Sequence, residues 1–336
     1  MDARSLFVRL LKDGQGAMNL TSLAKNPVPG GAVVGELRGY DGRPLRFARW
    51  GATRGPRRGT VCLFQGRGEY IEKYFEVISD LRRRGFAVAA LDWRGQGRSA
   101  RLLSNRNKGH IWDFSEYDKD LTRFMKDVVL PDCPPPFVAL AHSMGGTIML
   151  RNAGQRGSWF ERMVLSAPMI AIDKRKSGYP DWLVRSYSEA VSACGVGTAY
   201  VPGGSDQPAE LLPFERNDLT SDRERYQRNK SVLEVAPDLG LGSATVAWLR
   251  AAYRATAALQ KPGYAERVEV PVLLLAAGND TIVSTRAIEA FGVRLKIGTH
   301  ILLPGAKHEI LQETDAIRQR FWAAFDAYLG INEAAA

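Results

Sequence analysis

The sequence has few cysteines and histidines, and no long uninterrupted apolar run. Its three cysteines (Cys62, Cys133 and Cys194) are far apart, which excludes both a disulfide framework and a C-x-x-C metal motif and favours a reducing compartment. No stretch reaches the ~18 apolar residues that a membrane-spanning helix needs. Charges interrupt the apolar positions of the N-terminus, so no secretory signal is predicted. We therefore expect a cytoplasmic protein with no metal and no other cofactor.

The composition is that of a globular chain with a basic N-terminal third. The 336 residues are 45% apolar and 24% charged, and the net charge is +10. Residues 1–110 hold 21 basic side chains against nine acidic ones. The excess gathers at Arg57, Arg58, Arg82, Arg83, Arg84, Arg94, Arg98 and Arg101. Such a face is either ordinary solvated surface or a contact for an anionic membrane, here the inner membrane face. Nucleic acid is not predicted, because no recognition helix accompanies the charge.

Strand-like and helix-like segments alternate along most of the chain. Apolar runs predict strands at 45–50, 60–64, 86–91, 137–141, 163–166, 272–276 and 300–303. Helical periodicity predicts helices at 70–84, 116–129, 143–152, 243–259, 285–291 and 316–329. This rhythm indicates an α/β fold, with helices on both faces of a mostly parallel sheet.

Residues 170–240 interrupt the alternation, because Gly, Pro, Ser and charged residues are frequent there and no run resembles a strand. We therefore predict a core made of residues 35–169 and 241–336, with an inserted helical cap at 170–240. Residues 1–34 are predicted to be a loosely ordered leader, and Met18 is an alternative start.

The stretch around Ser143 carries the most informative motif. A buried strand runs into Ser143 and a helix follows at once, so the turn strains the serine backbone and exposes its hydroxyl at the carboxyl edge of the sheet. Such a turn requires small residues two positions before and after the serine. Here they are Ala141 and Gly145, giving A-x-S-x-G. We predict a nucleophile, and the alternative is a serine that only caps the helix.

A serine nucleophile needs a base and an acid that orients the base. His308 lies between the last strand and the last helix, at the sheet edge where a base would face Ser143. His142 adjoins the serine and is expected to point away from it. Asp280 follows the strand at 272–276 and is the predicted acid, with Asp173 as the alternative. The order Ser, Asp, His along the chain is that of the α/β-hydrolase fold.

The tetrahedral intermediate needs backbone N–H donors. Met144, directly after the nucleophile, supplies one. The loop after the strand at 60–64 supplies the other, and we predict the N–H of Arg67, which Gly66 and Gly68 flank. A phosphate-binding loop is the competing interpretation, but the Gly-Lys-Ser/Thr ending is missing. A second glycine-rich loop, Asp92–Ser99, is expected to support the site.

Together these motifs resemble those of the α/β-hydrolases of the monoacylglycerol lipase and bacterial lysophospholipase group, also labelled serine aminopeptidase-like. The resemblance covers about residues 35–330 and rests on Gln65–Glu69, Asp92–Ser99, His142–Gly146, Gly278–Asp280 and Lys307–Glu309. It implies serine carboxylesterase chemistry on acyl glycerols or lysophospholipids. It also implies a triad of Ser143, Asp280 and His308, with Arg67 and Met144 as oxyanion donors. Two positions depart from the pattern: Gln65 stands where histidine is frequent, and Ala141 replaces the elbow glycine.

The predicted protein is a serine hydrolase that cleaves lipid esters, either lysophospholipids or monoacylglycerols, through an acyl-enzyme. Trp182, Leu183 and Tyr187 are expected to line an acyl-chain tunnel in the cap, and core packing of the cap is the alternative. The Arg67 side chain and the basic N-terminal third favour an anionic head group or an anionic bilayer. A peptidase or amidase, a thioesterase, a carbon–carbon hydrolase and a non-catalytic binding protein on the same fold stay open, as does the oligomeric state.

Overall fold

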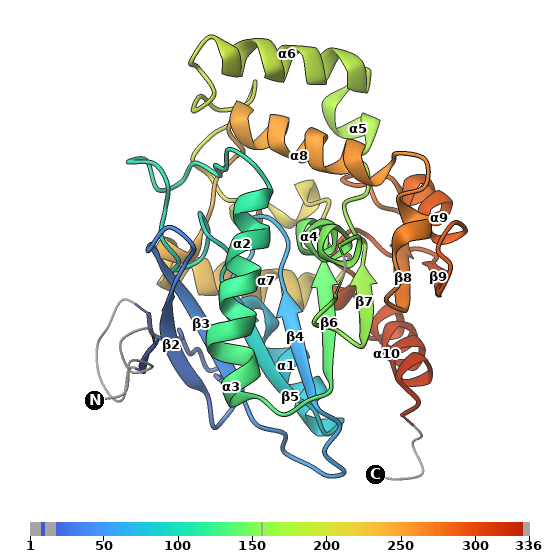
Figure 1. Cartoon of the computed structure of the whole chain (residues 1–336). Coiled ribbons are helices and arrows are strands. Elements are labelled where there is room, and N and C mark those ends of the chain that lie inside the picture. The colour runs from blue at the N-terminus through green and yellow to red at the C-terminus, as the bar shows by residue number, and fades with distance from the viewer. Residues whose placement is uncertain (1–7, 11–17, 156, 332–336) are drawn as a thin grey trace.

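The computed structural model describes residues 8–10, 18–155 and 157–331, and a nine-stranded sheet runs through it (Figure 1). The strands lie in the order β1-β2-β3-β5-β4-β6-β7-β8-β9. Pairs are antiparallel from β1 to β5 and parallel from β5 to β9. Their bounds are β1 Val8–Leu10, β2 Val33–Arg38, β3 Pro44–Trp50, β4 Thr60–Phe64, β5 Ala87–Leu91, β6 Phe137–His142, β7 Arg162–Ser166, β8 Val272–Ala277 and β9 Gly298–Leu303.

Helices cover both faces of this sheet. Figure 1 shows α2 and α4 in front of the strands and α1 behind them. Ion pairs from Arg318 of α10 to Glu76 and Asp80 of α1 hold those two helices side by side. Their bounds are α1 Phe75–Arg83, α2 Ser115–Phe124, α3 Leu130–Asp132, α4 Met144–Ala153, α5 Lys174–Ser177, α6 Asp181–Ala193, α7 Arg223–Val235, α8 Val246–Leu259, α9 Thr285–Gly292 and α10 Asp315–Leu329. The predicted α/β architecture is confirmed.

The central strands are apolar because both of their faces are covered. Every residue of β4, β5 and β8 is buried, as expected of parallel strands between two helical layers. The helix predicted from residue 243 begins at Val246, because the Thr245 hydroxyl accepts the Trp248 N–H and caps the first turn. The helix predicted at 70–84 opens with a 3₁₀ turn at Ile71–Tyr74 before α1.

Residues 18–34 of the predicted leader pack against the core, which corrects the expectation of loose order there. The Thr21 N–H and the Asn26 amide both donate to Glu72, and the Pro29 carbonyl accepts the Trp50 indole N–H. Strand β2 already begins at Val33. The leader's remaining residues, apart from β1, lie outside the described part of the chain.

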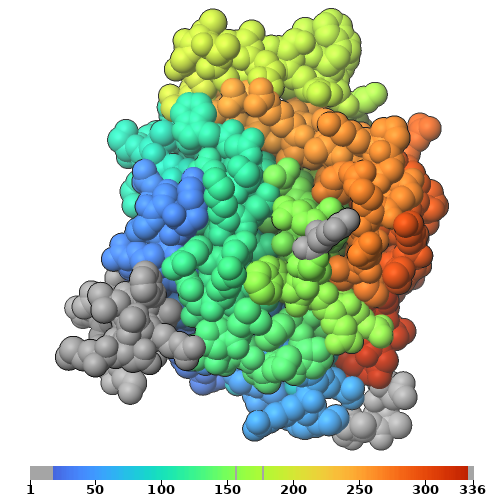
Figure 2. Space-filling view, in the orientation of Figure 1, coloured from blue at the N-terminus to red at the C-terminus, as the bar shows by residue number. Residues whose placement is uncertain are grey.

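The segment 170–240 contributes helices α5, α6 and α7 to the described structure and no strand. Helix α6 packs on α8 and stands out at the top of the molecule (Figure 2). Helix α7 lies elsewhere and buries its apolar residues against Tyr70. The exact bounds of the cap stay a prediction. None of the helices in the described ranges combines the length and hydropathy needed to span a bilayer.

Most of these arginines of the N-terminal third form ion pairs or hydrogen bonds within the protein. Arg84 pairs with Asp326, Arg94 with Asp120, and Arg98 with Asp238. Arg82 and Arg101 donate instead to backbone carbonyls. Most of the basic excess therefore holds the fold together, rather than forming one open basic face.

Candidate active site

Ser143 occupies a sharp turn between β6 and α4. Its φ is 50°, in the left-handed region where a residue with a side chain is strained. A Cβ added to Gly145 would fall 2.4 Å from the Phe64 carbonyl oxygen, because the end of β4 crowds the turn. The local geometry is the one that the A-x-S-x-G motif predicts, and it brings the hydroxyl to the carboxyl edge of the sheet.

Loops after β8 and β9 bring two further predicted residues to this serine. His308 Nε2 lies 2.9 Å from Ser143 Oγ, and His308 Nδ1 lies 2.7 Å from Asp280 Oδ2. The other Asp280 oxygen accepts the N–H groups of Ile282 and Val283, at 2.8 and 3.0 Å. All three predicted side chains are buried. The structure thus brings Ser143, His308 and Asp280 within hydrogen-bond distance of one another.

Asp280 is surrounded by groups that favour its charged form. Burial alone would raise its pKa, but His308 and the two N–H groups outweigh burial and leave the pKa below its ordinary value. A charged carboxylate at Nδ1 holds the proton there and leaves Nε2 free to accept the serine proton. The alternative acid, Asp173, instead caps α5 and pairs with Arg175.

The loop after β4 lies against the serine. A Cβ on Gly66 would be 3.2 Å from the Ser143 Cβ. The Gly66 N–H donates to Glu69 and the Gly68 N–H to Gln96, whereas the Arg67 N–H between them meets no acceptor among the described residues. The Met144 N–H, at the first position of α4, is likewise without one. These are the two donors that the sequence predicts.

The second glycine-rich loop holds the first one in shape. The Gln96 side-chain amide donates to the carbonyls of Gly66 and Glu69, at 2.8 and 3.0 Å. Asp92 accepts the Ile71 N–H at 3.0 Å and pairs with the buried Arg46. Asp92–Ser99 therefore supports the site, as expected.

Sequence reasoning missed a buried charge cluster behind the site, formed by Glu69, Lys73, His142, Glu210 and Glu309. The Lys73 Nζ lies 2.5 Å from Glu309, 3.2 Å from Glu69 and 3.3 Å from Glu210, and its side chain is fully buried. Burial opposes its charge, but the three carboxylates raise the pKa of Lys73 well above its ordinary value. The ammonium group is therefore charged and joins three separate segments of the chain.

The cluster connects the parts that surround the serine. Glu69 holds the loop after β4, Glu309 directly follows His308, and Glu210 belongs to the segment 170–240. His142 Nδ1 lies 3.0 Å from Glu69 and its Nε2 is 3.2 Å from the His308 carbonyl oxygen, so the ring contacts the backbone of His308. The one sequence signal was the four-residue spacing of Glu69 and Lys73.

The expected tunnel residues do not line a tunnel. The exposed fractions of Trp182, Leu183 and Tyr187 are 68%, 39% and 39%. Helix α6 buries Val184 and Ser188 instead, on the side that packs on α8. The tunnel expectation is therefore wrong for these three side chains, which form an outward apolar face.

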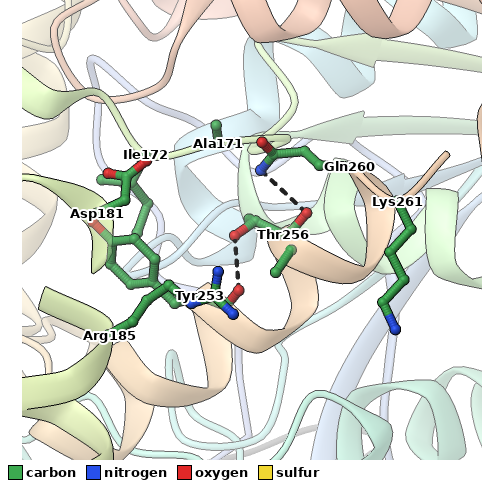
Figure 3. Close-up of a pocket in the computed structure, with 9 residues that line it drawn as sticks. Ala171, Ile172, Asp181, Arg185, Tyr253, Thr256, Gln260 and Lys261 are labelled. Atoms are coloured by element: carbon green, nitrogen blue, oxygen red, sulfur yellow. Dashed lines mark hydrogen bonds between the residues drawn. The ribbon is translucent and has the colours of Figure 1, made fainter. Parts of the chain in front are cut away.

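A cavity of about 230 Å³ lies between α6 and α8 (Figure 3). It is lined by Ala171, Ile172, Asp181, Arg185, Tyr253, Thr256, Ala257, Gln260 and Lys261. Neither Ser143 nor His308 nor Asp280 contributes to its wall. Its charged lining makes it a poor acyl-chain site. In the ranges that the structure describes, no group of three or more His, Cys, Asp or Glu side chains could hold a metal ion.

Comparisons with known proteins extend over most of the chain. The family described as serine aminopeptidase S33 matches residues 55–315. Lysophospholipase L2 of Escherichia coli strain K12 is 34% identical over 290 residues, which cover 84% of this chain and 83% of the relative. The monoacylglycerol lipase of Mycolicibacterium smegmatis is 28% identical over 265 residues, covering 77% and 84%.

Solved structures share the architecture. A soluble variant of the Saccharomyces cerevisiae monoglyceride lipase, in complex with a substrate analog, superposes with a TM-score of 0.69 at 21% identity, covering 87% of this chain and 94% of that one. The Paleococcus ferrophilus monoacylglycerol lipase gives 0.65 at 23% identity, covering 86% and 99%. At these identities the likeness concerns the fold.

Proposed function

Because the chain belongs to the serine aminopeptidase S33 family of α/β-hydrolases and is a carboxylic ester hydrolase acting on lipid esters, we propose that Ser143, His308 and Asp280 form its catalytic triad. The observation that carries the proposal is the hydrogen-bonded series of these side chains, with distances of 2.9 and 2.7 Å. The reaction proceeds through an acyl-enzyme.

In the first step the Ser143 Oγ attacks the ester carbonyl carbon while His308 Nε2 takes the hydroxyl proton. Asp280 stabilises the imidazolium, and the N–H groups of Arg67 and Met144 bind the oxyanion. Collapse of the intermediate breaks the ester bond, and the leaving alcohol takes the proton from His308. Water then attacks the acyl-enzyme by the same route in reverse and releases the fatty acid.

The substrate class follows from the relatives. They are named lysophospholipase L2 and monoacylglycerol lipase, and both names describe glycerol that carries one acyl chain. We propose a single-chain acyl glycerol, phosphorylated or not, as the substrate. Peptides and thioesters are the competing substrate classes.

The outward face of α6 supports a contact with the membrane in which such lipids reside. Trp182, Leu183 and Tyr187, together with Tyr179 just before the helix, are exposed. Aromatic side chains of this kind favour the membrane–water interface. We propose that this face, defined by these four residues, lies on the bilayer.

Replacing Ser143 with alanine tests the triad. Hydrolysis of p-nitrophenyl esters and of a monoacylglycerol should fall at least about a thousandfold, because a triad without its nucleophile retains only binding and oxyanion contributions. Asp280→Asn should cost a similar factor, whereas Asp173→Asn, the matched control, should not. A fluorophosphonate probe should label Ser143 in the native protein. Full esterase activity in Ser143→Ala would disprove the assignment, and faster cleavage of amides or thioesters would favour the competing classes.

A further inference from the structure

The guanidinium of Arg67 is a partly enclosed cation without a carboxylate partner. Its Nη2 donates to the Gly242 carbonyl at 2.7 Å, and its Cζ lies 5.2 Å from the centre of the Trp248 ring. Its Nε is buried and meets no hydrogen-bond acceptor in the part of the chain that the structure describes. Within the described residues no carboxylate forms an ion pair with it.

Two fully buried arginines of this protein are neutralised by carboxylates, whereas Arg82 and Arg101 donate to backbone carbonyls, as Arg67 does. Arg46 pairs with Glu72 and Asp92, and Arg94 pairs with Asp41, Glu116 and Asp120. Burial without such a partner lowers the pKa of Arg67 to about 10, so the group stays charged at neutral pH. An enclosed charge of this kind is costly unless an opposite charge joins it, and a ligand can supply that charge.

The side chain starts beside the reacting atoms. The Arg67 N–H is the proposed oxyanion donor, and Gly66 directly before it lies against Ser143. An extended arginine side chain carries its guanidinium about 6–7 Å from its own backbone, so the Arg67 guanidinium can reach a group about that far from a carbonyl held at its N–H. In a 1-acyl lysophospholipid the phosphorus is separated from that carbonyl carbon by six bonds, which span a similar distance of about 6–7 Å.

The neighbouring loop leaves room for the guanidinium. A Cβ on Gly109 would fall 2.3 Å from its Nη2, so only the bare backbone of a glycine allows the guanidinium to lie there. The Gly109 N–H in turn donates to the Ser243 carbonyl, next to the Gly242 that accepts from Arg67. The same Cβ would fall 3.1 Å from Nε, so the two loops contact the edge that carries Nε and Nη2, and Nη1 is left with no acceptor among the described residues.

We propose that Arg67 binds the phosphate of a lysophospholipid, so that the preferred substrate of the triad is a phosphate-bearing lysolipid and not a neutral monoacylglycerol. A guanidinium suits this role because its planar N–H groups match two oxygens of one phosphate. The phosphate is bound and not cleaved, so the covalent steps are those of ester hydrolysis. This inference rests on the proposed function and specifies its substrate.

Paired substrates test it. The kcat/KM values for 1-octanoyl lysophosphatidylglycerol and for 1-octanoylglycerol are measured with the native enzyme and with Arg67→Met, Arg67→Lys and Arg57→Met. The ratio of the two values should fall about 10- to 100-fold in Arg67→Met, the factor expected for a lost charge-assisted hydrogen-bond pair. Arg67→Lys should restore part of it, and the exposed control Arg57→Met should leave it unchanged. A ratio measured in one preparation does not depend on the folded fraction.

Non-hydrolysable ethers supply a second readout. The phosphate-bearing 1-O-octyl ether should inhibit the native enzyme more strongly than 1-O-octylglycerol, and Arg67→Met should abolish the difference. Equal losses on both substrates in Arg67→Met, or an unchanged ratio, would overturn the inference while the proposed function stands. Inhibition by inorganic phosphate as strong as that by the ether would overturn the lipid assignment. A native enzyme that cleaves neither ester would instead refute the proposed function.

Discussion

Replacing Lys73 with methionine would remove the ammonium group from the buried charge cluster. In the native protein this group lies within 3.3 Å of carboxylate oxygens from Glu69, Glu210 and Glu309. Methionine has a similar length and no charge, so the variant would leave these carboxylates buried around an uncharged thioether. We expect a large loss of stability.

The size of the loss follows from the burial of the cluster. Removing one partner of a buried ion pair costs about 3–5 kcal/mol, because the remaining charge stays desolvated. That is a large part of the roughly 5–15 kcal/mol by which a protein is stable. Burial already raises the pKa of Glu309, and Lys73 acts in the opposite direction. Without the lysine, the pKa of Glu309 in the folded state should rise further above its value in the unfolded state. The loss of stability should therefore grow as pH rises from the unfolded pKa through the folded pKa.

Urea denaturation followed by tryptophan fluorescence measures this effect. The free energy of unfolding of Lys73→Met should be about 3–5 kcal/mol below native at pH 8 and closer to native at pH 5. Adding Glu309→Gln should recover part of the loss. Lys126, exposed on the turn after α2, provides the matched control Lys126→Met. A Lys73→Met protein within about 1 kcal/mol of native at pH 8 would refute the reasoning, since it would mean that the cluster is not desolvated.

Two further predictions concern Glu76 and the α6 face. Burial would raise the pKa of Glu76, but ion pairs with Arg225, Arg228 and Arg318 outweigh it and lower that pKa to about 2. The stabilising effect of the Glu76 carboxylate should be complete above pH 5 and disappear as pH falls toward 2. The difference in free energy of unfolding between the native protein and Glu76→Gln should therefore shrink to zero in acid denaturation curves. A difference that stays constant with pH would contradict this. Trp182→Ser with Tyr187→Ser should weaken vesicle co-sedimentation several-fold, and the control Val293→Ser should not; equal binding would argue against the α6 face.

The triad candidates could be predicted because topology places them. Parallel strands end at one edge of the sheet, so Ser143, Asp280 and His308, each just after a strand, had to lie near one another despite their separation along the chain. The glycine-rich loops were predictable for the same reason, since both follow buried strands. Local pattern and topology were sufficient for this part of the site.

The buried charge cluster could not be predicted in this way. Lys73 contacts Glu210 and Glu309 across 137 and 236 positions, and no local pattern relates such residues.

The α6 face was misjudged for a different reason. Periodicity identifies an apolar face but not what covers it, and the small side of α6, with Val184 and Ser188, packs on α8 while the aromatic side does not. The order of residues 18–34 was misjudged because the residues that contact Glu72 and Trp50, Asn26 and Pro29, lie in irregular loops that show no periodicity.

The positive φ at Ser143 means that thermal stability and catalytic activity favour different residues at this position. Glycine adopts that conformation without strain, so a serine-to-glycine change there should relax the turn while deleting the proposed nucleophile. Selecting variants for heat resistance alone would therefore reward the loss of the reaction at this residue. A screen for thermostable variants of this enzyme should therefore also measure ester hydrolysis whenever residue 143 is allowed to vary.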